Sequence, residues 1–434
     1  MFGLTPEALA FVVFSLGMLV LMGTGMNMGL ALVLTGAGMA WVLDFWDTQL
    51  LAQNLVAGVD SFPLLAVPFF ILAGELMNSG GISRRIIDMA QAWVGHIRGG
   101  LGYVAIGAAV LMASMSGSAL ADTAALATIL LPMMRQQGYP MNTSAGLIAS
   151  GGIIAPIIPP SMPFVIYGVT TNTSISALFV SGIVPGLMMG AGLIFAWRWV
   201  LRGMDLPQGQ PLPMKDRLRA TARAFWAMLM PIIIIGGMKT GVFTPTEAAV
   251  VAVFYGLFVG MVIHRTITVR DLFPILRESG ELSAVILIVV SLAGIFAYSL
   301  STLGVIDPVA NAIVNSGLGE YGVLALLIVL LITVGMFLDG ISIFLIFVPL
   351  LLPIMQHYHW DPVWFGVILT LKVALGQFTP PLAVNLMVSC RIAGVRMEST
   401  VRWVGWMLLA MFLVMVLVIA FPPLALWLPA RLGY

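Results

Sequence analysis

Two proline pairs interrupt long apolar stretches of this sequence. They stand in the segments 155–160 (APIIPP) and 376–381 (GQFTPP), at an offset of 221 residues (159 to 380). Proline lacks an amide hydrogen and clashes with the preceding helical turn, so each pair leaves backbone carbonyl oxygens without a helical partner. Carbonyl oxygens clustered at membrane depth suit a hard cation. These residues therefore predict ion binding rather than catalysis.

A short turn lies upstream of each proline pair. The turns are 114–118 (SMSGS) and 335–340 (GMFLDG), and each separates two apolar arms. The arms span 102–113 and 119–134 in the first case and 322–334 and 341–356 in the second. Arms of this length are too short to cross a bilayer core of about 30 Å, so each pair predicts a re-entrant hairpin. A hairpin tip places carbonyl ends beside amide ends, which suits a cation next to a carboxylate.

Three ionisable residues fall inside these apolar segments: Asp122, Asp339 and Lys372. An unpaired ammonium at membrane depth costs about 3 kcal/mol or more. Lys372 is therefore expected to pair with a substrate carboxylate, with an acid such as Asp339, or with another subunit. Asp122 also fits a helix dipole in the first turn of an arm, and Asp339 fits either a helix cap or the site itself. Amide side chains that can add hydrogen bonds are Asn172, Gln377 and Asn385.

Composition places the chain in a membrane. Of its 434 residues, 60% are hydrophobic and only 9% are charged, and the mean hydropathy is +1.07. These values are far from those of soluble domains, so the predicted fold class is an all-α polytopic membrane protein. Residues 1–22 have no basic start and no small-residue cleavage site, which predicts a first mature helix. A lone Cys390 is expected to be a packing residue.

The apolar segments are expected to follow one order twice. The first half has crossings at 4–22, 26–45 and 60–79, an interfacial helix at 83–98, a hairpin, a broken crossing at 142–170 and a helix at 176–202. The second half has crossings at 222–240, 246–265 and 283–303, an interfacial segment at 307–317, a hairpin, a broken crossing at 363–391 and a helix at 400–428. The predicted domains are a repeat at 1–203 (scaffold 1–98, transport elements 99–175, scaffold helix 176–203), a linker at 204–221, and a repeat at 222–434 (scaffold 222–318, transport elements 319–398, last helix 399–434).

Charge predicts how this repeat is oriented. Five full crossings per half make the second half enter the membrane from the opposite side, which is an inverted repeat. With the N-terminus outside, all 19 Lys and Arg residues except Lys239, Lys372 and Arg431 lie on cytoplasmic segments. This bias obeys the positive-inside rule and predicts that both termini are periplasmic. Hairpins that cannot span the bilayer are most easily exposed to both sides if they slide as one body within a frame.

Four motifs together carry a family resemblance. The run 241–249 (GVFTPTEAA), the serine-rich tip that leads to Asp122, the run 158–161 (IPPS) and the TPP break at 379–381 resemble the large membrane subunit of tripartite ATP-independent periplasmic (TRAP) transporters. The resemblance covers essentially the whole chain. It implies an elevator-type importer of small organic acids in the bacterial inner membrane, driven by about two sodium ions. It also implies a small membrane subunit, here as a separate chain, and a soluble periplasmic substrate-binding protein.

The family pattern places ion ligands on both tips and both breaks. A first sodium ion is expected at Ser114, Ser116 and the carbonyl oxygens of Ala155, Ile158 and Pro160. A second is expected at Gly335, Gly376, Thr379 and Leu382. Substrate contacts are expected from Ser118, Asp339, Lys372 and Asn385. Relatives often have glycine where Ala155 and Pro156 stand, so the first ion site departs from the pattern.

Two other classes share parts of this pattern. A stand-alone sodium/divalent-anion symporter has the same architecture and would lack a small four-helix partner. An intramembrane aspartyl protease would use two aspartates such as Asp122 and Asp339, but it leaves the inverted repeat unexplained. No Gly-Lys-Ser/Thr phosphate loop is present to use ATP. The sequence does not select among C4-dicarboxylates, sialic acid and sugar acids as substrate.

Overall fold

The computed structural model describes residues 17–18, 20–21, 24–206, 208–304, 306–336, 338, 340–380 and 383–434. Every regular element in this part of the chain is a helix, which confirms the all-α class. Most of the expected first crossing lies outside the described residues. Two of the expected site residues, Asp339 and Leu382, also lie outside them.

The first half contains the predicted hairpin and the predicted broken crossing. Its helices are α2 (Met28–Val42), α3 (Thr48–Ala57), η1 (Phe62–Leu65), α4 (Ala66–Ser79), α5 (Ile82–Val94), α6 (Gly100–Ser116), α7 (Ala119–Gln136), α8 (Met141–Gly152), α9 (Met162–Thr171), α10 (Ile175–Val200) and η2 (Leu201–Gly203). Helix α5 is amphipathic, with Ile86 buried and Arg84 exposed. Helix α3 was not expected; Asp47 caps it by accepting hydrogen bonds from the amides of Gln49 and Leu50.

The second half also contains two helices joined by a short turn and an interrupted helix, but its boundaries differ from the expected ones. Its helices are α11 (Met214–Lys239), α12 (Pro245–Phe258), the π-helical turn η3 (Val259–Ile263), α13 (Val269–Thr302), α14 (Ile306–Val314), α15 (Gly319–Gly335), α16 (Gly340–His357), α17 (Pro362–Phe378), α18 (Val384–Ala393), η4 (Met397–Thr400), α19 (Val401–Ala420) and α20 (Pro423–Leu432). The last part of the expected linker, 214–221, is helical. The expected single helix at 400–428 is two helices, because Pro422 and Pro423 interrupt it.

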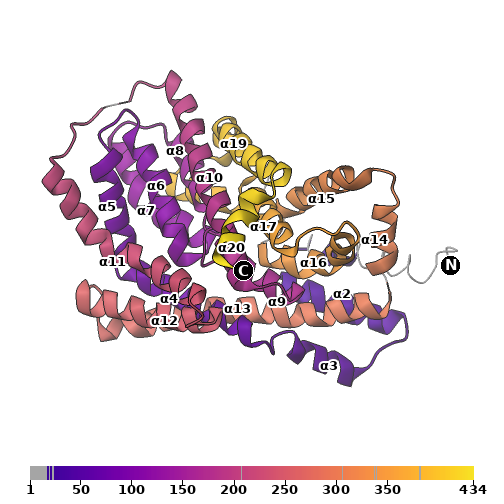
Figure 1. Ribbon diagram of the computed structural model, residues 1–434. Coiled ribbons are helices and arrows are strands. Elements are labelled where there is room, and N and C mark those ends of the chain that lie inside the picture. Colours follow the sequence, from indigo (N-terminus) through magenta and orange to yellow (C-terminus); the bar gives the residue numbers. More distant parts are fainter. Residues whose placement is uncertain are drawn as a thin grey trace.

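Six helices form one layer, which we call the frame layer. Helices α4, α12 and α13 pack side by side, α2 and α3 lie along α13, and α11 packs on α12 (Figure 1). Close backbone approach joins α2 to α13: a Cβ on Gly36 would lie 3.0 Å from the Cα of Phe296. Beside it, Ser299 Oγ donates a hydrogen bond of 2.9 Å to the carbonyl oxygen of Gly36. This layer is the flat base on which the rest of the molecule rests.

The two hairpins and the two broken crossings, α6–α9 and α15–α18, interlock; we call them the hairpin group. Helix α18 packs against α7 and α8, where Ser389 Oγ donates to Ala145 O at 2.8 Å. Helix α9 packs on α16 and α17, where Tyr167 Oη donates to Pro362 O at 2.7 Å. The second part of each broken crossing, α9 or α18, therefore packs against elements of the other half.

Helix α10 packs with the hairpin group. It contacts α6, α8, α9, α17, α19 and α20, and its main contact with the frame layer is with α11. The indole of Trp197 lies against Gly102, and its Nε1 donates to Gly99 O at 3.0 Å. Gly102 lets the large indole approach the backbone of α6. The prediction that 176–203 belongs to the scaffold stays a prediction.

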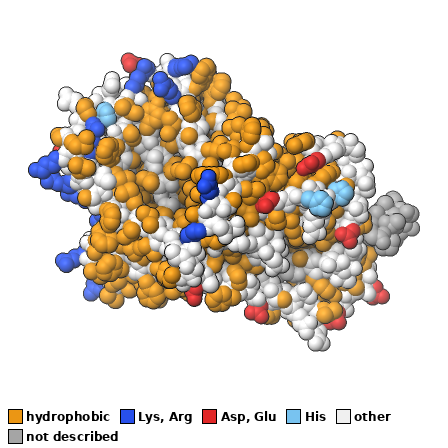
Figure 2. All heavy atoms as spheres, in the orientation of Figure 1, with side chains coloured by type: hydrophobic (Ala, Val, Ile, Leu, Met, Phe, Trp, Pro, Cys, Tyr) orange, Lys and Arg blue, Asp and Glu red, His pale blue; other side chains and the backbone are white. Residues whose placement is uncertain are grey.

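Seven of the described helices are long and apolar enough to cross a membrane. They are Phe62–Ser79, Ile175–Gly203, Met214–Lys239, Pro245–Ile263, Val269–Thr302, Gly340–His357 and Met397–Ala420. The hairpin arms are 17 or 18 residues long, longer than expected, because the helices extend further at one or both ends. The expectation that every arm is too short to span was wrong for Gly340–His357, which is long and apolar enough to cross a membrane. Figure 2 shows Lys and Arg gathered at the end that carries α5 and α11, and Asp and Glu toward the opposite end, near α3, α14 and α15.

Candidate functional site

The tip of the first hairpin rests on the first helix break. Helix α6 ends at Ser116, and Gly117 takes a left-handed conformation with φ +61°. A Cβ on Gly117 would lie 2.4 Å from the carbonyl oxygen of Pro160, so only glycine allows this approach. Behind the tip, a Cβ on Gly74 of α4 would lie 3.2 Å from the Cα of Ser116. The tip is thus held between the break and the frame layer.

The first break exposes carbonyl oxygens that nothing in the described part of the chain satisfies. No described residue donates a hydrogen bond to the carbonyl oxygen of Ala155, Ile158 or Pro160. By contrast, the carbonyl of Pro156 accepts from Ser161 Oγ. The three free carbonyls are buried, and a buried acceptor without a partner is costly unless an ion or water meets it. The sequence predicted these three carbonyls as ion ligands.

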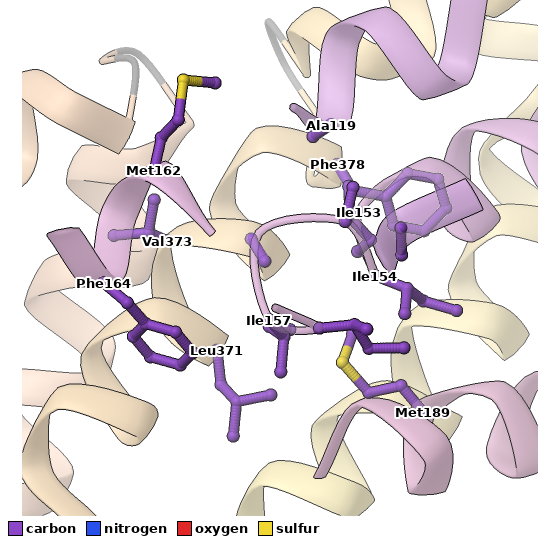
Figure 3. Close-up of a cluster of buried hydrophobic side chains, with 14 of the residues drawn as sticks. Ala119, Ile153, Ile154, Ile157, Met162, Phe164, Met189, Leu371, Val373 and Phe378 are labelled. Atoms are coloured by element: carbon purple, nitrogen blue, oxygen red, sulfur yellow. The ribbon is translucent and has the colours of Figure 1, made fainter. Parts of the chain in front are cut away.

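Apolar side chains surround this break. Figure 3 shows Ile153, Ile154 and Ile157 on the loop between α8 and α9, with Phe164 and Leu371 nearby. On the α10 side, a Cβ on Gly182 would lie 2.0 Å from the carbonyl oxygen of Ile157, so α10 packs directly on the loop. Charges placed here would be poorly shielded from one another.

The serines of the first tip have partners of their own. Ser116 Oγ donates to Asp122 Oδ1 at 2.5 Å and accepts from the amide of Ser118 at 3.1 Å. Ser114 Oγ donates to Leu111 O at 2.6 Å. Ser118 caps α7 by accepting from the amide of Ala121 at 3.4 Å. Each hydroxyl oxygen still has acceptor capacity for a cation, but Ser118 has a structural role that the sequence did not assign to it.

Asp122 is the acid of this tip. It is 2% exposed, and its Oδ2 has no partner among the described residues. It does stand in the first turn of α7, where the sequence placed it beside a helix dipole. The next residue, Thr123, is also fully buried, and its hydroxyl has no partner among the described residues. A Cβ on Gly152 would lie 1.8 Å from the Thr123 Oγ1, so only glycine fits there. The sequence analysis did not name Thr123 as a site residue, although its position directly after an acid at membrane depth could have indicated it.

The second tip and the second break also meet. A Cβ on Gly376 would lie 2.7 Å from the Cα of Gly335, so the two backbones touch. Thr379 follows the end of α17, donating its hydroxyl to Leu375 O at 2.6 Å and its amide to Gly376 O at 3.0 Å. The Thr379 hydroxyl oxygen retains lone pairs for a cation. Three of the four expected ligands of the second ion are therefore neighbours, and Leu382 is outside the described residues.

Two buried donors flank the second break. Lys372 is fully buried in α17, and its Nζ has no hydrogen-bond acceptor among the described residues; the ring of Phe365 lies 5.9 Å away. Asn385, in the first turn of α18, is 2% exposed and its Nδ2 is also without a described partner. The oxygens of a carboxylate could accept hydrogen bonds from these two buried donors. Asp339, the third expected contact, is not described.

The remaining amide candidates lie elsewhere. Asn172 is exposed and caps the far end of α9 with φ +54°, which is a structural role. Gln377 is half-buried in the last turn of α17 and its Nε2 lies close to Gly340, at the start of α16. Only Gln377 therefore stands beside a tip.

Comparisons with known proteins agree on one family. The family model described as tripartite ATP-independent periplasmic transporter, DctM component, matches residues 15–424. The chain is 44% identical to the 2,3-diketo-L-gulonate TRAP transporter large permease protein of Escherichia coli, over 92% of this chain and 94% of that protein. It is 37% identical to the sialic acid TRAP transporter large permease protein of Vibrio cholerae, over 96% and 98%. It is 35% identical to the C4-dicarboxylate TRAP transporter large permease protein of Pseudomonas aeruginosa, over 88% and 90%.

A solved structure shares the fold. The YdaH transporter of Alcanivorax borkumensis superposes with a TM-score of 0.60 over 87% of this chain and 90% of that one. The two sequences are only 13% identical, so the likeness concerns the fold alone.

The contact between the first tip and its break predicts a matched pair of variants. Gly117 and Gly138 both have positive φ, so alanine costs about 1–2 kcal/mol at either position. Nothing lies within 4 Å of a Cβ on Gly138, whereas one on Gly117 meets Pro160 O at 2.4 Å. We expect Gly117→Ala to lower the free energy of unfolding by about 1–3 kcal/mol more than Gly138→Ala does, because the added methyl group overpacks the contact with Pro160. Thermal unfolding of the purified variants in detergent measures this, and equal losses would contradict the tip contact.

Proposed function

Since the chain belongs to the DctM family of tripartite ATP-independent periplasmic transporters, we propose that it imports a small organic acid on a sodium gradient. The family is one of transporter permeases, not enzymes, so the protease alternative is set aside. In this proposal the chain is the large membrane subunit of a complex. A small membrane subunit and a periplasmic binding protein complete it, and the binding protein delivers the substrate.

The observation that carries the proposal is that each hairpin tip meets a helix break. Gly117 touches Pro160 in one half, and Gly335 touches Gly376 in the other. Each junction combines carbonyl oxygens with hydroxyl groups and, in the first, the free carbonyls have no other described partner. Oxygen ligands of this kind suit a hard monovalent cation such as sodium, because they can replace the water oxygens of its hydration shell. We therefore assign one sodium ion to each junction.

The substrate side of the proposal rests on Lys372 and Asn385. Both are buried donors without a described acceptor, and one stands before the second break and the other after it. A carboxylate has two oxygens, so it can accept from both while it also lies at the N-terminus of α18. Three relatives are named as transporters of diketogulonate, sialic acid and C4-dicarboxylates, which fits a carboxylate substrate here.

The alternating step is proposed to be an elevator movement. The hairpin group, with α10 attached to it, forms a unit that packs internally, and this unit would slide against the frame layer. Two inverted repeats would give this unit similar contacts in its inward and outward positions. The acidic end of the molecule in Figure 2, toward α3, α14 and α15, would face the periplasm and the binding protein. Both termini would then be periplasmic, in a bacterial inner membrane.

Sodium coupling is tested by uptake into proteoliposomes. Ligand screening of the neighbouring binding protein supplies the substrate, and the complete complex is reconstituted. We expect uptake on an inward sodium gradient and little uptake when potassium replaces sodium, because the cation completes the carbonyl clusters. Equal uptake in sodium-free buffer driven by a proton gradient would contradict the assignment. Full activity without the small subunit would instead favour a stand-alone symporter.

Thr379 provides a test of the second ion site. Thr379→Ala removes a proposed ligand hydroxyl while both prolines still break the helix. Losing one contact between a hydroxyl oxygen and a charged group costs about 1.5–3 kcal/mol of binding free energy. The sodium concentration that gives half-maximal uptake should therefore rise about 10- to 100-fold. Thr333→Ala is the control, since exposed Thr333 donates to Val329 O at 2.8 Å in the same way. A sodium titration of uptake that is unchanged in Thr379→Ala would remove this residue from the site.

A cross-link tests the sliding movement. A Cβ on Gly74 of the frame layer would lie 3.6 Å from Cβ of Ser116 at the first tip, a separation that a disulfide accepts. In a Cys390→Ser background, oxidation of the Gly74→Cys/Ser116→Cys pair should stop the uptake that the reduced pair retains, and reduction should restore uptake to that level. The single variant Ser116→Cys measures separately the loss caused by removing the proposed ligand hydroxyl. The control pair is Leu76→Cys/Gly256→Cys, which joins α4 to α12 within the frame layer. If oxidation of the tip pair leaves uptake at full rate, the elevator is wrong and a local gate replaces it.

A further inference from the structure

A pocket of about 610 Å³ opens at the basic end of the molecule, away from both tips. It lies where α5 meets α11 and the turn that follows η3. Helix α5 contributes Arg84, Arg85 and Asp88, and α11 contributes Arg223. None of these residues belongs to the proposed ion or substrate sites. The pocket therefore needs an explanation of its own.

The pocket carries an excess of positive charge. Three arginines and one aspartate leave a net charge of +2. The ion pairs within the described chain, Arg219 with Asp216 and Arg277 with Glu281, lie outside it. Burial, and secondarily the charge of Arg85, lower the pKa of His264 on the pocket wall, which disfavours the charged imidazolium. The positive charge is that of the guanidinium groups, which remain ionised.

One arginine fixes the geometry while the other two are free to bind. Arg85 donates from Nη1 to the carbonyl oxygens of Gly80 at 3.2 Å and Gly81 at 2.9 Å. A nitrogen of His264, Nδ1, lies 3.3 Å from the same Gly80 oxygen and ties the turn to the end of α4. Arg84 and Arg223 are exposed on two different helices. Guanidinium groups converging from two helices suit the several oxygens of one phosphate group.

Part of the wall is apolar and adjoins exposed aromatic side chains. Trp226 and Ile263 line the pocket beside the arginines. Trp226 also packs edge-on against Phe225 and Phe258, which are themselves exposed on membrane-crossing helices. Aromatic residues of this kind mark the level of lipid headgroups. A ligand that fits both surfaces carries a phosphate group and an acyl chain.

We propose that this pocket binds the headgroup of an anionic phospholipid through its phosphate. Basic pockets between membrane helices at the cytoplasmic surface are suited to such headgroups. The lipid would sit against α5, which packs on both α6 and α11, at the junction of the hairpin group with the frame layer. The proposal does not depend on sodium coupling or on the identity of the substrate.

The test compares two double variants of the complete, delipidated complex in detergent. Arg84→Gln/Arg223→Gln removes two charges from the pocket. Arg219→Gln/Arg277→Gln removes two charges from exposed ion pairs outside it. Native mass spectrometry then measures binding of dioleoyl phosphatidylglycerol, with dioleoyl phosphatidylcholine as the neutral reference. We expect the pocket variant to bind phosphatidylglycerol at least about tenfold more weakly, and the control variant to bind it as the wild type does.

Four results would overturn the proposal. Equal weakening in both variants would mean that overall surface charge, not the pocket, attracts the lipid. Displacement of phosphatidylglycerol by millimolar inorganic phosphate would identify a site for a soluble anion. Unchanged lipid binding with loss of the small membrane subunit from the pocket variant would identify a protein contact instead. Binding of lipid by the Arg84→Gln/Arg223→Gln variant at wild-type strength also rejects the assignment.

Discussion

Backbone carbonyl oxygens without partners, buried in an apolar interior, are the constraint on which the rest of this structure depends. The prolines at 156, 159 and 160 prevent a helix from continuing, and the loop that results is enclosed by isoleucine and phenylalanine side chains (Figure 3). A loop of this kind is stable at membrane depth only where protein, water or an ion meets its polar groups. The hairpin tip at Gly117 closes one side of the loop, and a cation would satisfy the oxygens that remain.

The packing around the breaks determines which helices can move together. Glycines permit the close contacts: Gly182 of α10 on the first break, Gly102 of α6 under Trp197, and Gly366 of α17 against Tyr167. Such interdigitated surfaces do not slide, because every step would leave large side chains without partners. The contact between α4 and the first tip is different, since it is made by Gly74 and the short serine turn. A boundary for sliding is therefore more easily placed there than along α10.

The sequence predicts those features that arise locally. Proline pairs mark both breaks, and the serine and glycine turns mark both hairpins; the structure places each where it is expected. The sequence does not show in advance which helices pack together, because a contact such as that of Trp197 with Gly102 joins positions far apart in the chain. The bond from Ser116 to Asp122 was also missed, and it gives the first tip a structural network of its own. The split between α19 and α20 had a visible signal in Pro422 and Pro423.

The order of residues around the second break bears on how ion and substrate could be coupled. Lys372 stands before the break, Gly376 and Thr379 form it, and Asn385 follows it in the first turn of α18. A carboxylate held by both donors would need the two half-helices fixed relative to one another, which is what a cation on the Gly376 and Thr379 oxygens would provide. Without the cation, the carboxylate is held less firmly, and the buried ammonium of Lys372 stays unpaired at a cost of about 3 kcal/mol. A bound cation would raise the affinity for the carboxylate, and by reciprocity the carboxylate would raise the affinity for the cation.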